Sequence, residues 1–229
     1  MATPYHRATE RVITAPAPSV LSTNRVLRNT YLLLALTLGF SAVTAGVAMA
    51  ANMGSLGLLP TLIGYFGLLF LTQYLRNSAW GLLAVFALTG FMGLTLGPLL
   101  NAYMGAFANG PQLVAMAFGG TAAVFVGLSA YALTTRRDFT FMGGMLFAGI
   151  LVAFLAGLAA YFLAMPGLSL AVSALVVMLM AGLILFETSA IVHGGETNYI
   201  MATVSLYVAI YNMFTSLLHL FGFFGGGDE

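Results

Sequence analysis

The chain alternates between long uncharged hydrophobic runs and short polar segments. Between Arg28 and Arg76 lie 47 residues without a formal charge, and between Arg76 and Arg136 lie 59. A helix that crosses a bilayer needs about 20 apolar residues, so each of these runs is long enough for two helices. Turn-forming Asn, Gly and Pro residues near 51–55 and 101–111 divide the two runs into hairpins.

The C-terminal half follows the same pattern. The 48 uncharged residues of 139–186 are divided at Met165-Pro-Gly167, and the 31 uncharged residues after Glu196 hold one more helix. The pattern therefore predicts an all-α bundle of seven transmembrane helices. The predicted spans lie near residues 30–51, 55–75, 79–100, 112–133, 140–163, 168–191 and 199–223.

The first 28 residues are polar and contain four arginines, among them Arg7 and Arg11. Such a composition is typical of disorder, so residues 1–28 are expected to form a loose tail. The membrane domain would cover residues 29–224, and residues 225–229 would form a short C-terminal tail. Because the first apolar run begins only at Thr30 and is longer than the core of a signal peptide, it is expected to remain as the first transmembrane helix.

The positions of the charges predict the orientation in the membrane. Each long uncharged run is a hairpin, so both of its charged flanks lie on the same side, and all seven arginines share that side. Short cytosolic loops carry an excess of Arg and Lys. The arginine side and the N-terminus are therefore expected to be cytosolic, and seven spans place the C-terminus in the periplasm.

Composition excludes several functions. With 61% hydrophobic and 6% charged residues, the chain is not a soluble domain. It has no Cys and no Lys, which excludes disulfides, thiolate chemistry and a retinal Schiff base. The glycines are numerous, and the spacing of Gly93 and Gly97 favours close helix packing. The pattern fits packing within one chain or between two copies.

Glu187 is the charge that lies clearly inside a span, about two turns from the cytosolic end of the sixth helix. An ionised carboxylate at the bilayer centre costs roughly 2.5–3.5 kcal/mol, so an intramembrane Glu is a candidate for proton or ion sensing. The alternative is a structural ion pair with Arg76, Arg136 or Arg137, which lie near the same face.

The seventh helix carries a polar stripe that includes Ser205, Asn212 and His219. Because the sixth and seventh helices form a hairpin, the stripe passes Glu187 and could line a polar cavity with it. The alternative is ordinary hydrogen bonding between packed helices.

The turn between these helices reads His193-Gly-Gly-Glu-Thr-Asn-Tyr199. Its glycines suit a helix end, and Thr197 or Asn198 suits the cap of the next helix. Glu196 then lies near a helix N-terminus, where negative charge is favoured. His193 titrates near neutral pH, so it is either a cytosolic pH sensor or a solvated loop residue.

Enzymatic chemistry is not indicated. The chain contains no zinc-protease H-E-x-x-H motif and no nucleophile turn of the G-x-S-x-G type. Ser205 and His219 are 14 positions apart, or about 21 Å along a helix, which is too far for a catalytic pair. We expect no enzyme activity, no metal site, no cofactor and no nucleic-acid partner.

Several segments resemble a known family. They are Arg25-Val-Leu-Arg-Asn-Thr-Tyr31, Leu133-Thr-Thr-Arg-Arg-Asp138, Phe141-Met-Gly-Gly-Met-Leu146, Phe186-Glu-Thr-Ser189, His193-Gly-Gly-Glu-Thr-Asn-Tyr-Ile200 and Ala202-Thr-Val-Ser-Leu-Tyr-Val-Ala-Ile-Tyr-Asn212. They look like the bacterial YccA branch of the Bax inhibitor-1 family, and the similarity extends from about Ser22 to the end of the chain.

The resemblance implies a multi-pass protein of the bacterial inner membrane. It would bind and inhibit the ATP-dependent membrane protease FtsH, and it would itself be a poor substrate that the protease grips by the N-terminal tail with Arg7 and Arg11. Other branches of the family are pH-sensitive calcium leak channels with two paired acidic residues on the sixth and seventh helices. Glu187 matches the first of these positions, whereas the second falls on Ala209, which weakens the channel alternative for this chain.

Overall fold

The computed structural model describes residues 20–225, and the side chains of residues 25–225. Within this range the secondary structure is entirely helical, and seven helices are long and apolar enough to cross a membrane, as predicted. The helices are α1 Val20–Ala50, α2 Leu58–Leu75, α3 Trp80–Ala106, α4 Gly110–Thr135, α5 Gly143–Phe162, α6 Pro166–Val192 and α7 Tyr199–Gly225, with a short 3-10 turn, η1, at Thr140–Met142.

The first helix begins earlier than the hydrophobic pattern indicates. The sequence predicts that residues 20–28 belong to the disordered tail, but in the structure they form the first turns of α1, which starts at Val20. A helix satisfies its backbone hydrogen bonds internally, so it can extend past the apolar segment into the polar surroundings. The tail boundary at residue 28 is therefore wrong. The rest of the predicted tail, including Arg7 and Arg11, lies outside the described residues.

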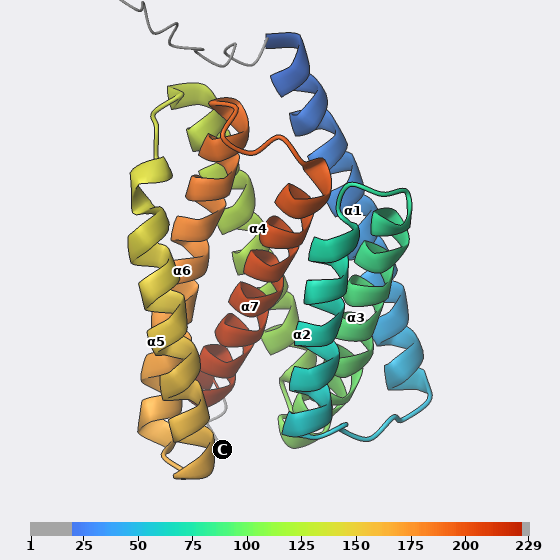
Figure 1. Ribbon diagram of the computed structural model, residues 1–229. Helices are drawn as coiled ribbons and strands as arrows, with labels where there is room; N and C mark the ends of the chain where they lie inside the picture. The colour runs from blue at the N-terminus through green and yellow to red at the C-terminus, as the bar shows by residue number, and fades with distance from the viewer. Residues whose placement is uncertain (1–19, 226–229) are drawn as a thin grey trace, which may run out of the picture.

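The seventh helix lies at the centre of the bundle (Figure 1). In that view α5 and α6 stand on one side of it and α1, α2 and α3 on the other, with α4 behind. It packs against α6, α4 and α1. Half of the residues in its most apolar stretch are buried, whereas only 6% of those in the corresponding stretch of α2 are. Helix α7 is therefore the central helix, and α2 is a peripheral one.

The helices run up and down, so alternate loops meet at the same end of the molecule. The start of α1, the α2–α3 loop, the α4–α5 loop and the α6–α7 loop lie together at the upper end in Figure 1. The described arginines, at positions 25, 28, 76, 136 and 137, belong to this end. We call it the arginine end. The side of the membrane that it faces stays a prediction.

Glycines on α3 bring α1 and α3 into close contact. A Cβ atom on Gly93 would collide with the Ser41 carbonyl and the Thr44 hydroxyl of α1, and one on Gly97 would lie 2.5 Å from the Ala48 Cβ. The small-residue pattern of α3 is therefore used for packing within the chain. Of the two alternatives that the sequence left open, packing within the chain accounts for this pair.

A buried hydroxyl network joins three helices. The Tyr207 hydroxyl of α7 donates a hydrogen bond to the Thr89 carbonyl of α3 at 3.2 Å. It also lies 2.6 Å from the Ser41 hydroxyl of α1, which therefore acts as the donor to Tyr207. Tyr207 is only 1% exposed. These contacts fix α1 and α3 against the central helix.

Candidate functional site

Glu187 is the carboxylate that the structure places inside a span among the described residues. It is 5% exposed and lies on α6, one and a half turns before the helix ends at Val192. The Ser205 hydroxyl of α7 lies beside it. The structure thus joins two residues that the sequence analysis singled out, Glu187 and Ser205.

The rest of the polar stripe of α7 serves separate contacts. The Asn212 side-chain amide donates to the Val208 carbonyl of its own helix at 2.8 Å. Near the far end, the His219 Nδ1 atom lies 2.8 Å from the Ser173 hydroxyl of α6. Since His219 is about 21 Å from Ser205 along α7, it does not belong to the site of Glu187 and Ser205. Hydrogen-bonded packing accounts for this part of the stripe.

The three arginines considered as partners of Glu187 make backbone contacts to the end of α6 and to the α6–α7 loop. The Arg76 carbonyl accepts a hydrogen bond from the Asn198 amide at 3.0 Å, and the Arg137 carbonyl accepts one from the Ser189 hydroxyl at 3.1 Å. The Arg136 carbonyl lies 3.0 Å from the His193 Nε2 atom. All three arginine residues are exposed. An ion pair between any of them and Glu187 stays a prediction.

His193 clamps the α4–α5 loop to the end of α6. Its Nδ1 atom lies 2.9 Å from the Ser189 carbonyl, while its Nε2 atom lies 3.0 Å from the Arg136 carbonyl. A carbonyl accepts hydrogen bonds and cannot donate them, and a neutral imidazole carries only one N–H group. The Nδ1 atom also lies 3.3 Å from the Ser189 hydroxyl, so a neutral ring can accept a hydrogen bond there while its Nε2–H group donates to the Arg136 carbonyl.

Asp138, in the same loop, supplies a neighbouring negative charge. Its Oδ1 atom accepts hydrogen bonds from the Thr140 hydroxyl at 2.6 Å and the Thr140 backbone amide at 2.8 Å. These two bonds, with a smaller contribution from the charge of His193, lower the pKa of Asp138 below its usual value. The carboxylate therefore stays ionised while it orders the start of η1.

Asn198 joins the α2–α3 loop to the α6–α7 loop. Its Oδ1 atom accepts hydrogen bonds from the backbone amides of Ile200 and Met201, so it caps α7 as the sequence indicated. Its Nδ2 group donates to the Arg76 carbonyl and to the Asn77 side chain. Sequence analysis missed this second role, because it depends on loops that are more than a hundred residues apart.

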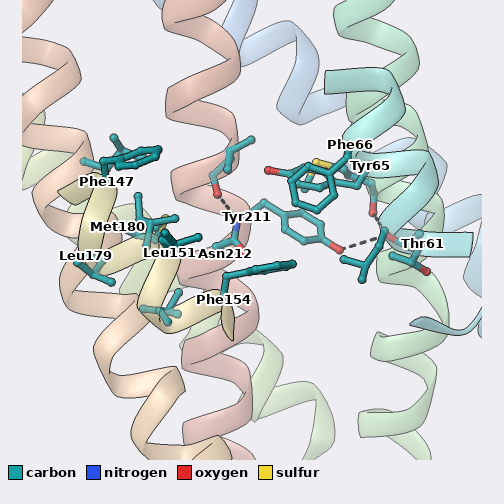
Figure 2. Close-up of a pocket in the computed structure, with 18 of the residues that line it drawn as sticks. Thr61, Tyr65, Phe66, Phe147, Leu151, Phe154, Leu179, Met180, Tyr211 and Asn212 are labelled. Atoms are coloured by element: carbon teal, nitrogen blue, oxygen red, sulfur yellow. Dashed lines mark hydrogen bonds between the residues drawn. The ribbon is translucent and has the colours of Figure 1, made fainter. Parts of the chain in front are cut away.

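A cavity of 540 Å³ lies between α2, α3, α5, α6 and α7 (Figure 2). Its lining is mostly apolar, with Tyr65, Tyr211 and Asn212 among the few polar side chains. Leu183 marks its end toward the arginine end, one helical turn before Glu187. The cavity therefore approaches Glu187 and Ser205 but does not include them, contrary to the polar cavity that the sequence suggested.

Metal binding has little support in the described part of the chain. No group of three or more His, Asp or Glu side chains there is arranged to hold a metal ion. The site consists of one buried carboxylate, a neighbouring hydroxyl and a set of clamped loops.

A bundle of seven apolar helices, with α7 at its centre, defines a multi-pass membrane protein. A family model described as "Inhibitor of apoptosis-promoting Bax1" matches residues 23–226, so the chain belongs to the Bax inhibitor-1 family.

Relatives of known name support the membrane location. The chain is 55% identical over 205 residues to "Modulator of FtsH protease YccA" of Escherichia coli K12, which covers 90% of this chain and 93% of the relative. It is 56% identical to an uncharacterised protein of Pseudomonas aeruginosa, over 89% of this chain and 91% of the relative. A relative in another Escherichia coli strain is named "Inner membrane protein YccA" and is 55% identical over the same shares of both chains. The chain is an inner-membrane protein.

Proposed function

We propose that this protein binds the membrane protease FtsH and inhibits it, acting as a binding partner without enzymatic chemistry of its own. The observation that carries the proposal is the 55% identity, over 90% of the chain, to a protein named as a modulator of that protease. Identity at this level over nearly the full length makes a shared partner the simplest expectation.

The arginine end faces the cytosol in this proposal, with the N-terminus on the same side and the C-terminus in the periplasm. The positive-inside bias of short loops supports this orientation, because the arginines of the described loops and of the start of α1 gather at one end. The loops clamped by His193 and Asn198 would then form the surface nearest to the protease.

Resistance to extraction provides a physical route to inhibition. Residues 1–19, with Arg7 and Arg11, would be the segment that the protease grips, and pulling on them loads α1 first. Two glycines of α3, Gly93 and Gly97, pack tightly against this helix. Two hydrogen bonds also join it to α7, one between the Ser41 and Tyr207 hydroxyls and one from the Thr203 hydroxyl to the Thr30 carbonyl. A substrate that unfolds slowly keeps the protease occupied.

Co-purification from detergent-solubilised membranes tests the interaction. A variant that lacks residues 2–19 leaves α1 complete from Val20, and a matched control replaces the same residues by a Gly/Ser segment of equal length. Full-length protein should co-purify with FtsH, and the deletion should slow its degradation. If the full-length chain does not associate with FtsH, the proposal is wrong. If the Gly/Ser control is degraded as fast as the native chain, the protease requires a tail of this length but does not require Arg7 and Arg11.

A proton-regulated cation leak is the second candidate, and the buried Glu187 beside Ser205 favours it. Two observations weigh against it. Ala209, at the position expected to carry a second acidic residue, is fully buried, and the cavity next to Glu187 is lined mostly by apolar side chains. A bare cation in such surroundings is strongly disfavoured, so conduction requires a different arrangement of the helices.

Calcium flux into proteoliposomes at about pH 6 and about pH 8 tests the leak. The candidate function requires a flux that depends on pH in the native protein and loses that dependence in Glu187→Gln. Equal fluxes in protein-containing and empty vesicles, or an unchanged pH profile in the variant, would exclude it. The protease assay is independent of this result.

A further inference from the structure

The lateral cavity lies at the middle depth of the membrane. Its lining includes Tyr65 of α2, Met92 of α3, Phe154 of α5, Met180 of α6 and Asn212 of α7, and each of these residues is within two positions of the midpoint of its helix. Because the cavity lies at the midpoints of five membrane-spanning helices, its lining is at the depth of the lipid hydrocarbon, about 15 Å from either headgroup region.

The cavity opens sideways toward the lipid. Phe147 and Leu151 of α5 both line it and are 73% and 49% exposed on the outer surface. Helix α2 packs mainly against α3, and α5 mainly against α6. The described contact across the opening is an edge-to-face pair between Phe66 and Phe154, with ring centroids 5.8 Å apart. The mouth of the cavity therefore lies between α2 and α5.

Water and ions are poor occupants of this space. A buried water molecule needs two to four polar partners, but the lining is mostly apolar, and three of its polar side chains already bond within the protein. The Tyr211 hydroxyl lies 3.2 Å from that of Thr95, which itself donates to the Met92 carbonyl, and the Asn212 amide bonds to its own helix. Figure 2 shows Tyr211 and Asn212 between Leu151 and Met180 on one side and Tyr65 and Phe66 on the other.

We propose that this cavity is a binding site for one acyl chain of a membrane phospholipid, which enters between α2 and α5. The phospholipids of the surrounding bilayer supply hydrocarbon at this depth, and the mouth is open to them. A methylene group is close in size to a water molecule, which takes about 30 Å³ in the liquid. The 540 Å³ of the cavity therefore accommodate at least one chain of ordinary length.

Photo-crosslinking in vesicles tests the site. The probe is a phosphatidylethanolamine with a diazirine midway along one acyl chain, diluted into unlabelled phosphatidylethanolamine and phosphatidylglycerol. Met180 is the diagnostic residue, because it lines the cavity but is only 5% exposed. Labelling of Met180, together with the exposed rim residues, is the expected result. Labelling confined to the rim would overturn the proposal.

A matched pair of substitutions locates the mouth. Leu151→Trp places a large ring at the opening and is expected to abolish the labelling of Met180. Leu36→Trp makes the same change on the lipid-facing surface of α1, where Leu36 is 63% exposed, and should leave it unchanged. Phe147→Trp is a second rim variant if Leu151→Trp does not fold. Labelling of Met180 that survives in a folded rim variant would overturn the proposal. So would labelling by a free fatty-acid probe only, or a protein crosslink in place of the lipid.

Discussion

Replacing Asn198 tests whether the loops of the arginine end stabilise the bundle. The Asn198 Oδ1 atom accepts hydrogen bonds from the amides of Ile200 at 3.0 Å and Met201 at 3.2 Å. Its Nδ2 group donates to the Arg76 carbonyl at 3.0 Å and to the Asn77 Oδ1 atom at 2.9 Å. The first pair caps α7, and the second pair ties it to the α2–α3 loop.

The structure separates these two contributions. Losing a helix N-cap costs about 1 kcal/mol of unfolding free energy. A hydrogen bond contributes about 0.5–1.5 kcal/mol, and the two bonds of the Nδ2 group lie at an exposed position, so together they contribute about 1 kcal/mol. Asn198→Ala should therefore destabilise the protein by about 2 kcal/mol. Asn198→Asp keeps the cap but loses the two donors, so it should cost about half as much.

Reversible unfolding in mixed detergent micelles, followed by helical circular dichroism, measures these free energies. Asn77→Ala is the control, because it removes one acceptor without touching the cap, and about 0.5 kcal/mol is expected. Equal destabilisation by Asn198→Asp and Asn198→Ala would show that the cap contributes nothing. No destabilisation by either variant would refute a stabilising role for the loop contacts.

Three further predictions follow from buried contacts and loop positions. Tyr207→Phe removes two buried hydrogen bonds that join α7 to α1 and α3 and should cost about 1–2 kcal/mol in the same unfolding assay; an unchanged stability would contradict the network. Gly97→Val places side-chain atoms against Ala48, so overpacking of about 1–3 kcal/mol is expected, and a neutral effect would show that α1 moves away freely. The chain lacks Cys, so single Ser55→Cys and Ser78→Cys variants report topology. A membrane-impermeant maleimide should label the first on intact cells and the second only after lysis, and the reverse pattern would invert the proposed orientation.

The number and order of the helices were predictable because each apolar segment is long enough to cross a bilayer and is bounded by charges or turn residues. The boundaries were less predictable. α3 continues to Ala106, past the predicted end near residue 100, and α1 begins at Val20. Hydropathy detects only the apolar part of a helix. The helix itself ends where the backbone leaves the helical conformation, as it does just after α6, where Gly194 has a φ of 74°.

The site was predictable only in part. Burial of Glu187 beside Ser205 followed from the hairpin of α6 and α7, because neighbours in a hairpin lie at equal depth. The contacts of Ser189 and of the arginine carbonyls did not follow, since main-chain acceptors leave no trace in residue type. Tyr207 was missed for a similar reason, because one Tyr among several on an apolar helix carries no signal for its distant partner.

Seven segments long and apolar enough to cross a membrane, arginines that flank the same ends of the hairpins, and the resemblance to a family could all be predicted from the sequence. Those properties depend on the hydrophobicity and the residue types of each segment, and they do not require knowledge of how the segments pack. Three features depend on how the helices pack: α7 is central and α2 peripheral, Gly93 and Gly97 contact α1, and an apolar cavity opens between α2 and α5. Most of the spans are apolar on all sides, so the hydrophobic pattern cannot distinguish a helix face that meets protein from one that meets lipid, and packing makes that choice.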